Sequence, residues 1–227
     1  MKLVKTEEFF KRSSDTLAAL LKELESKPTI DSKALIGNTA LIVVDMNEGF
    51  ATKGALYSPR IEALKPEIAR LAAAFDNNKD IPVLIVNDEH PKDSLEFKIY
   101  PQHCVKDTEE SRIIQELCQV RNSIIFPKSS TNGFVSEEFR EFIIKLKAKG
   151  IRNFVIVGDC TDICIYQLAT TMKAHFNHLN EEVQIIVPIN AVDTFDLEVT
   201  NHNGDLMNVV FLYSMMGNGI SVVREII

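Results

Sequence analysis

The chain contains 227 residues with a formal net charge of −7 at pH 7, and 45% of its residues are hydrophobic. An acidic chain without a Lys/Arg cluster is poorly suited to bind nucleic acid, and its apolar runs are too short to cross a bilayer. The first residues lack the apolar core of a signal peptide, and four cysteines without paired short spacings do not indicate a disulfide scaffold. We therefore expect one globular α/β domain in the cytoplasm, with neither a nucleic-acid nor a membrane partner.

The first predicted element is an amphipathic helix over residues 7–27, which Pro28 ends. One apolar stripe runs along it, formed by Phe10, Leu17, Leu20, Leu21 and Leu24. Such a stripe either covers the core of its own domain, which is the more common outcome, or contacts a second subunit, and both interpretations stay open here. We assign residues 1–37 to an N-terminal helical extension and residues 38–227 to the main domain.

Short apolar segments alternate with segments of helical spacing through the rest of the chain. The predicted strands are 39–45, 82–87, 123–126, 154–157, 183–188 and 220–223. The predicted helices are 61–75, 108–119, 136–147, a segment through Leu168, Met172 and Phe176, and 201–216. This alternation predicts a single-domain α/β fold with a six-stranded parallel sheet and helices on both faces, a Rossmann-like three-layer arrangement.

Three of the predicted strands lead into residues that can take part in catalysis. Asp45 ends the first strand, Lys128 follows the third, and Cys164 lies in the strand-to-helix turn after the fourth. The carboxyl ends of parallel strands form the ligand crevice of α/β folds, and the N-terminus of a helix favours a thiolate. Taken singly, each residue also fits a structural role, as a capping acid, a surface lysine and a buried inert thiol.

Two acids and two histidines follow the second strand within one short segment: Asp88, His90, Glu96 and His103. A lone histidine is more often a structural hydrogen-bonding residue, but this cluster offers the mixed oxygen and nitrogen ligands that suit zinc, manganese or iron. Glu96 is the least certain ligand, because an acid in a charged loop is usually solvated and can reach a metal through water. The segment predicts a site for one divalent ion.

Two motifs link these residues to a known family. Leu-Ile-Val-Val-Asp-Met-Asn, residues 41–47, and Gly158-x-x-Thr161-Asp162-x-Cys164 each stand at a strand end. With Lys128 between them in chain order, the sequence resembles the isochorismatase-like cysteine hydrolases over residues 38–225. The loop with Asp88-x-His90 and Tyr-Pro-Gln-His-Cys, residues 100–104, resembles the metal-dependent nicotinamidase branch of this family.

The resemblance implies a role for each candidate residue. Cys164 would be the nucleophile, Asp45 the proton acceptor and Lys128 the neighbouring cation, while the backbone N–H groups of Cys160 and Cys164 would form the oxyanion hole. The implied metal ligands are Asp88, His90 and His103, with Glu96 as an occasional fourth. The implied substrate contacts are Phe50, Tyr100 and Thr131. The resemblance also implies a cis peptide bond between Asp159 and Cys160.

The sequence departs from the family at two places. Asp159 and Cys160 stand where a small apolar pair is usual, and Ser-Ser-Thr, residues 129–131, follows Lys128 where many nicotinamidases have an aromatic or polar run that encloses the substrate. The first departure affects the backbone of the oxyanion hole, and the second leaves the identity of the substrate open. Cys104 and Cys118 do not lie in a strand-to-helix turn as Cys164 does, so we expect both to be packing residues.

The leading hypothesis is therefore a metal-dependent nicotinamidase, which forms nicotinate and ammonia through a thioester on Cys164. One alternative is a related hydrolase that acts on another small amide or ureide. Another is a catalytically silent member of the family that serves as a binding or oligomerisation module through its N-terminal helix. We expect a small-molecule substrate, one divalent ion with zinc favoured over manganese or iron, and a homo-oligomer.

Overall fold

All six predicted strands form in the computed structural model, which describes residues 6–78 and 80–227. The strands are β1 (Thr29–Ile30), β2 (Thr39–Val44), β3 (Val83–Asp88), β4 (Ser123–Lys128), β5 (Asn153–Asp159), β6 (Gln184–Pro188), β7 (Val192–Asp193), β8 (Ser221–Val223) and β9 (Glu225–Ile226). The α-helices are α1 (Glu7–Glu25), α2 (Glu48–Ala51), α3 (Pro59–Glu62), α4 (Lys65–Asp76), α5 (Glu137–Ala148), α6 (Tyr166–His178) and α7 (Gly204–Gly217). None of the helices in these ranges is both long and apolar enough to span a membrane.

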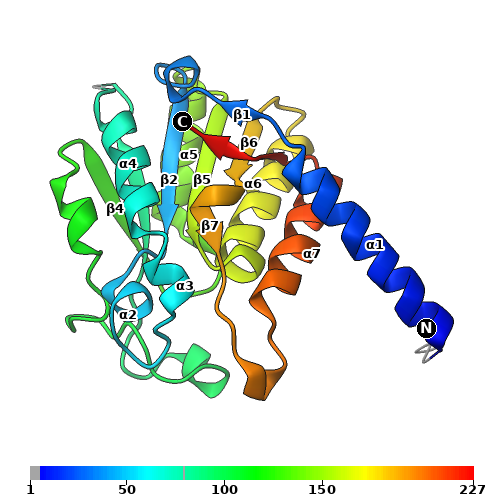
Figure 1. Ribbon diagram of the computed structural model, residues 1–227. Coiled ribbons are helices and arrows are strands. Elements are labelled where there is room, and N and C mark those ends of the chain that lie inside the picture. Colours follow the sequence, from blue (N-terminus) through cyan, green and yellow to red (C-terminus); the bar gives the residue numbers. More distant parts are fainter. Residues whose placement is uncertain (1–5, 79) are drawn as a thin grey trace.

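The main sheet is parallel and has the strand order β4-β3-β2-β5-β6-β8, with the short strand β7 paired to β5. It thus contains one strand more than the six predicted. From β2 the chain runs outward to β3 and β4, then returns to the other side of β2 and continues through β5, β6 and β8 (Figure 1). The direction of winding therefore reverses between β2 and β5, and such a switch point is where open α/β sheets bind their ligands.

Helices cover both faces of this sheet, and successive strand residues pack on opposite faces. On β2, Ile42 and Val44 join the core that α5, α6 and α7 cover, whereas Leu41 and Val43 join the core beneath α4.

The predicted helix 61–75 is divided into α3 and α4. Pro66 is the cause, because a proline has no N–H to continue the helical ladder but suits the first turn of a new helix.

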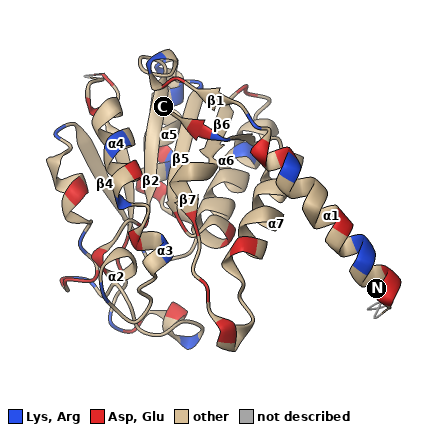
Figure 2. Ribbon diagram, viewed as in Figure 1, with Lys and Arg blue, Asp and Glu red and all other residues tan. Residues whose placement is uncertain are grey.

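The N-terminal helix is present, but it covers the core with only part of its predicted stripe. Leu24 is buried, and Leu17 and Leu20 pack partly against the core on the side of α7. Phe10 is 65% exposed and Leu21 48% exposed. The first turns of α1 extend away from the rest of the molecule (Figure 1) and carry alternating bands of acidic and basic residues (Figure 2).

The residues after α1 are tied to the C-terminus of the chain. Strand β1 pairs in parallel with β9, with Thr29 opposite Glu225 and Ile30 opposite Ile226. The backbone of Ser32 also donates a hydrogen bond to the carbonyl of Ile227. The predicted extension over residues 1–37 thus contacts the main domain through its second half, while the boundary at residue 38 stays a prediction.

The predicted helix over 108–119 is wrong, because its first part is a series of turns and only Gln115–Gln119 forms a 3-10 helix. The backbone of this segment is used by the chain around α2. The N–H of Gly49 donates to the carbonyl of Glu110, and that of Glu48 donates to the carbonyl of Arg112. These carbonyls are therefore not available for a helical ladder, and the segment instead holds the loop that follows Asp45.

Gly158 is required where β5 passes β2. Its φ is +113°, and a Cβ atom there would lie 2.0 Å from the carbonyl oxygen of Val44. We expect Gly158→Ala to lower the free energy of unfolding by more than about 3 kcal/mol, because both backbone strain and overlap oppose it. Gly150→Ala is the matched control, since its φ is +100° and no atom lies within 4 Å of the added Cβ. It should cost only about 1–2 kcal/mol in denaturant unfolding; equal losses in the two variants would contradict the overlap at Gly158.

Candidate active site

Cys164 lies where the sequence places it, just after the carboxyl end of β5. The chain leaves β5 through a cis peptide bond between Asp159 and Cys160, as the resemblance implies, and enters a π-helical turn, Thr161–Ile165, that leads into α6. The Sγ atom of Cys164 is 3.9 Å from the Nζ atom of Lys128, which comes from the end of β4. Two strands that are distant in the sheet order thus bring a thiol and a cation together.

Lys128 is buried among carboxylates at the end of the sheet. Its Nζ atom is 2.8 Å from Oδ2 of Asp45 and 2.9 Å from Oδ1 of Asp88, and Lys128 itself is 4% exposed. Burial disfavours its charged form, but the attraction of Asp45 and then of Asp88 outweighs this and holds the pKa of Lys128 well above its usual value. Lys128 is therefore a permanent cation.

Asp45 is suited to accept a proton near neutral pH. Its carboxylate is buried, and burial raises its pKa to about 6, with Lys128 opposing the rise and Asp88 adding to it. Because a general base works best with a pKa near the operating pH, Asp45 can both accept and release a proton under mild conditions. The sequence predicted the position of this acid but not its pKa.

Burial opposes the thiolate character predicted for Cys164. Burial raises the pKa of its thiol well above the usual value, and the nearby Lys128 lowers it by less than burial raises it. The dipole argument applied to the sequence omitted this desolvation, which favours the neutral thiol. A nucleophilic role for Cys164 would therefore require a base, and Asp45, which lies within hydrogen-bond reach of this thiol, is the acid that the resemblance implies for that role.

A potential metal site adjoins this group. Asp88, His90 and His103 are buried, and one ligand atom from each lies within 4.8 Å of the others. The Nε2 atoms of His90 and His103 both face Oδ2 of Asp88, at 2.8 and 3.2 Å. Nδ1 of His103 donates to the carbonyl of Pro101 at 2.7 Å, so the neutral form of this ring with its proton on Nδ1 would present the Nε2 lone pair to a metal. One oxygen and two nitrogens that converge in this way fit a catalytic zinc-type ion, which needs further coordination positions left open.

Glu96 lies beside the three convergent ligands without joining their cluster. Its Oε2 atom is 3.4 Å from Nε2 of His90, and its Oε1 atom accepts a hydrogen bond of 2.9 Å from the backbone N–H of Thr131. This position allows direct or water-mediated contact with an ion bound at His90. Its role as a ligand stays a prediction.

These groups surround one cavity of about 660 Å³ at the switch point of the sheet. Its wall includes the predicted residues Phe50, Asp88, Glu96, Tyr100, His103, Lys128, Thr131, Cys160 and Cys164. Asp45 and His90 lie directly behind this wall, in contact with Lys128 and Asp88 respectively. The structure thus brings every predicted site residue into one neighbourhood.

The sequence analysis assigned no role to several further residues that line the cavity. They come from the segment before α3, the turn around Cys164, the segment that leads into α7 and α7 itself, and they are Tyr57, Asp162, Phe195, His202 and Met207. His202 stacks on Phe195 with ring centroids 3.8 Å apart, and its Nε2 atom lies 2.9 Å from Oδ2 of Asp162. Asp162 belongs to the motif quoted above, and its need for a hydrogen-bonding partner was the available signal.

The fates of the remaining cysteines differ. Cys104 is buried, as expected for a packing residue, and its thiol donates to the carbonyl of Glu110 at 3.4 Å. Cys118 is exposed, so the prediction that it packs in the core is wrong. The cause is the loss of the helix predicted over 108–119, which would have placed Cys118 on an inward face.

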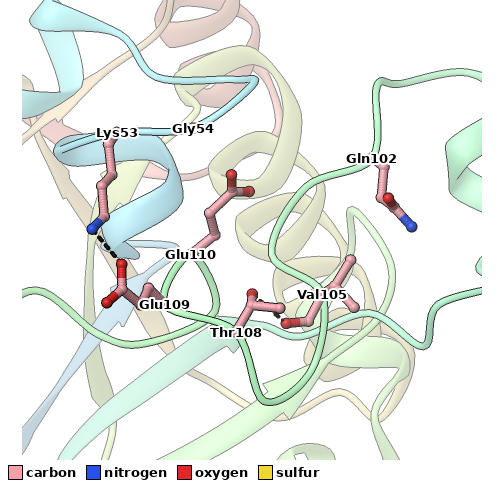
Figure 3. A pocket seen from close by; sticks show the side chains of 7 residues that line it. All are labelled: Lys53, Gly54, Gln102, Val105, Thr108, Glu109 and Glu110. Atoms are coloured by element: carbon pink, nitrogen blue, oxygen red, sulfur yellow. Dashed lines mark hydrogen bonds and ion pairs between the residues drawn. The ribbon is translucent and has the colours of Figure 1, made fainter.

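A second cavity, of about 490 Å³, is lined by residues just after α2 and by residues of the segment 102–110 (Figure 3). Lys53 points toward Glu109 and forms an ion pair with it, and the hydroxyl of Thr108 donates to the carbonyl of Val105. Gln102 and Glu110 are bonded to residues outside this cavity, through the carbonyl of Lys92 and the backbone N–H of Cys104, and none of the lining residues named for this cavity is a cysteine or histidine.

The rate at which iodoacetamide alkylates Cys164 should fall as pH is lowered through about 6. Protonation of Asp45 removes the base that accepts the thiol proton, and burial raises the pKa of Asp45 to about 6. Peptide mapping of the alkylated protein measures the rate at this cysteine. In the Asp45→Asn variant, Cys164 should be alkylated slowly, and its alkylation rate should show no inflection near pH 6. An inflection that stays in this variant would show that a group other than Asp45 causes it.

Comparison with known proteins agrees with this geometry. The isochorismatase domain model matches residues 39–215. Nicotinamidase 1 of Arabidopsis thaliana is 32% identical in sequence, over 88% of this chain and 92% of that protein. Ureidoacrylate amidohydrolase of Agrobacterium fabrum is 26% identical over 56% of this chain and 66% of that protein.

Solved structures share the fold. Pyrazinamidase of Pyrococcus horikoshii, solved in complex with zinc, superposes with a TM-score of 0.66 at 23% identity, over 82% of this chain and 99% of that chain. A second similar structure is N-carbamoylsarcosine amidase of Thermoplasma acidophilum, of which 96% is covered. The latter has a TM-score of 0.63 at 26% identity and also covers 82% of this chain. With its domain model matched and its strand-end residues in place, this chain belongs to the isochorismatase family of hydrolases.

Proposed function

We propose that this protein is a metal-dependent nicotinamidase, which hydrolyses nicotinamide to nicotinate and ammonia. The observation that carries the proposal is the position of Lys128, which contacts the metal-site acid Asp88, the base Asp45 and the nucleophile Cys164 in one cavity. The 32% identity to a nicotinamidase over most of both chains supports the same substrate.

The first half of the reaction forms a thioester. Asp45 accepts the thiol proton of Cys164 as the sulfur attacks the amide carbon, and the developing oxyanion is received by the backbone N–H groups of Cys160 and Cys164. The carbon–nitrogen bond then breaks, and Asp45 returns its proton to the leaving nitrogen, which departs as ammonia. Lys128 stabilises the negative charge that passes between Cys164 and Asp45.

Water completes the reaction in the second half. With Asp45 ionised again, it can accept a proton from water as the oxygen attacks the thioester carbon. The carbon–sulfur bond breaks, the proton returns to Cys164, and nicotinate is released. A divalent ion held by Asp88, His90 and His103 would supply Lewis acidity and a coordination position for a pyridine nitrogen. Zinc suits this donor set best, and manganese and iron are the alternatives.

Aromatic side chains around the metal site suit a pyridine ring. The ring of Phe50 is 5.6 Å from that of His103, and the ring of Tyr100 is 6.2 Å from it, measured between centroids. Thr131 lies on the same wall and is fixed through Glu96. A flat apolar substrate would thus be held beside the ligand histidine, with its carboxamide directed at Cys164.

Two other functions remain as outcomes of the test. The similarity to an ureidoacrylate amidohydrolase makes another small amide or a ureide the second choice of substrate. A silent binding module is disfavoured by the intact group of Asp45, Lys128 and Cys164. We also expect a homo-oligomer and a cytoplasmic location, as the sequence predicts.

Ammonia release from nicotinamide tests the proposed substrate. The wild type should release one ammonia for each nicotinate formed, and Cys164→Ala should lower the turnover number by at least about 1,000-fold, because it removes the nucleophile. Cys118→Ala is the control, since this cysteine is exposed and outside the cavity, and it should keep full activity. A wild type that releases ammonia from ureides but not from nicotinamide would contradict the substrate and keep the reaction class.

Elemental analysis tests the metal. The purified wild type should carry close to one divalent ion per chain, and chelation should abolish turnover of nicotinamide until the ion is restored. His90→Ala should lose both the ion and turnover, whereas His178→Ala, which changes an exposed histidine of α6, should keep both. Full turnover by metal-free protein would show that His90 and His103 are structural.

A further inference from the structure

Part of the cavity wall is the loop between β7 and α7, residues 194–203, which is orange in Figure 1. This 194–203 loop contains one 3-10 helix, Glu198–Thr200. The cavity residues that it supplies are Phe195, Asp196, Leu197, Thr200, Asn201 and His202. The groups assigned to catalysis lie on other segments, but this loop limits the space in which a substrate binds.

Arg60 of α3 holds both ends of this loop. Its Nε atom donates to the carbonyl of Thr194 at 2.9 Å and to Oδ1 of Asp193 at 3.1 Å. Its Nη2 atom lies 2.8 Å from the same Oδ1 and 2.9 Å from Oδ1 of Asp205. Asp193 precedes the loop and Asp205 follows it, so one planar guanidinium group connects the two ends, a geometry that suits the fixed fork of an arginine.

The contacts of Arg60 differ in strength. The side chains of Arg60 and Asp193 are 27% and 22% exposed, whereas that of Asp205 is 82% exposed. Partial burial strengthens the bonds to Asp193 and Thr194, while an ion pair to an exposed acid contributes little. The main anchor is therefore at the start of the loop, where it leaves β7.

The chain beside Arg60 is shaped to admit the guanidinium group. Gly204 is the first residue of α7, and a Cβ atom there would lie 3.1 Å from Nε of Arg60 and 2.9 Å from the carbonyl oxygen of Phe195. A side chain at this position would press on both groups. The glycine thus allows α7 to begin directly against Arg60 and the loop.

The same loop contacts the turn that carries Cys164. Nε2 of His202 lies 2.9 Å from Oδ2 of Asp162, and Asp162 belongs to the turn Thr161–Ile165. On the other side, the residues next to Arg60, Pro59 and Ile61, line the cavity themselves. Arg60 therefore connects two segments of the cavity wall without lining the cavity itself.

We propose that Arg60 is a positioning residue, which holds the 194–203 loop against α3 in the position that binds the substrate. A binding site that is formed only part of the time binds its ligand more weakly by that fraction. Loss of Arg60 should thus weaken binding. The reacting groups are instead held by the ion pairs of Lys128, to which Arg60 does not contribute. The inference rests on the proposed amide hydrolysis only for the choice of substrate.

Steady-state kinetics of Arg60→Met test this role. We expect KM for nicotinamide to rise by about 5- to 50-fold and kcat to change by less than about twofold. The inhibition constant of the product nicotinate should rise by the same factor as KM, because it is a binding constant that does not contain kcat. Arg60→Lys should give an intermediate KM, since one ammonium group can pair with Asp193 but lacks the fork that also reaches Thr194.

Arg70→Met is the matched control. Arg70 lies on α4, pairs with Glu67 and donates to the carbonyl of Ile226, and it is not among the residues that line the cavity. This variant should leave KM and kcat unchanged. A fall in kcat at constant KM in Arg60→Met, unchanged constants in that variant, or equal effects of the two substitutions would overturn the role of Arg60.

Hydrogen exchange supplies a readout that is independent of turnover. In Arg60→Met, peptides from the 194–203 loop should exchange at least about tenfold faster, whereas those from β2 to β5 should keep the wild-type rates. The fold should survive, because Asp193 still accepts bonds of 2.7 Å from the side chain of Asn208 and from the N–H of Thr194. Exchange that is faster throughout the molecule, or unchanged in the loop, would contradict a local role.

Hydrogen exchange also separates this inference from the proposed function. If the wild type acts on a ureide and not on nicotinamide, the proposed substrate fails, and KM is measured with the ureide instead. The exchange rates of the loop need no substrate. Faster exchange in the loop alone then supports the role of Arg60 whichever amide is hydrolysed, and unchanged exchange contradicts it even if the protein is a nicotinamidase.

Discussion

The buried ion pairs of Lys128 determine how this site is arranged. One ammonium group lies within 3 Å of carboxylate oxygens from Asp45 and Asp88, and 3.9 Å from the sulfur of Cys164. A buried lysine is stable only where acids surround it, and these acids in turn need a cation to stay ionised. The pairs therefore fix the distance between the proposed metal site and the proposed nucleophile, which the proposed substrate would span.

The topology of the sheet makes this arrangement possible. Asp45, Asp88 and Lys128 stand at the ends of β2, β3 and β4, which are neighbours in the sheet, and Cys164 follows β5 on the other side of β2. Parallel strands place all four residues on one edge, and the reversal of winding between β2 and β5 opens the cavity there. Gly158 lets these two strands approach closely, so its backbone conformation contributes to the site as well as to the fold.

The sequence predicted the main strands because each is a short, largely apolar run, and it predicted Asp45, Asp88 and Lys128 because charged residues stand at or just after the ends of such runs. It failed where long-range contacts decide the structure. The segment 108–119 has helical spacing, but its carbonyls bind the N–H groups of Glu48 and Gly49. The pKa of Cys164 and the stacking of His202 on Phe195 likewise depend on burial and on distant segments, which periodicity does not report.

Trapping of the acyl-enzyme tests most directly the claim that Lys128 joins the nucleophile to its base. Nicotinamide is mixed with enzyme, the reaction is quenched with acid, and the modified cysteine is identified by mass spectrometry. The account predicts a nicotinoyl adduct on Cys164, formed at least about 100-fold more slowly in a Lys128→Met variant that keeps the circular dichroism of the wild type. An adduct on Cys104, Cys118 or Cys160, or one that forms on Cys164 equally fast without Lys128, would contradict it.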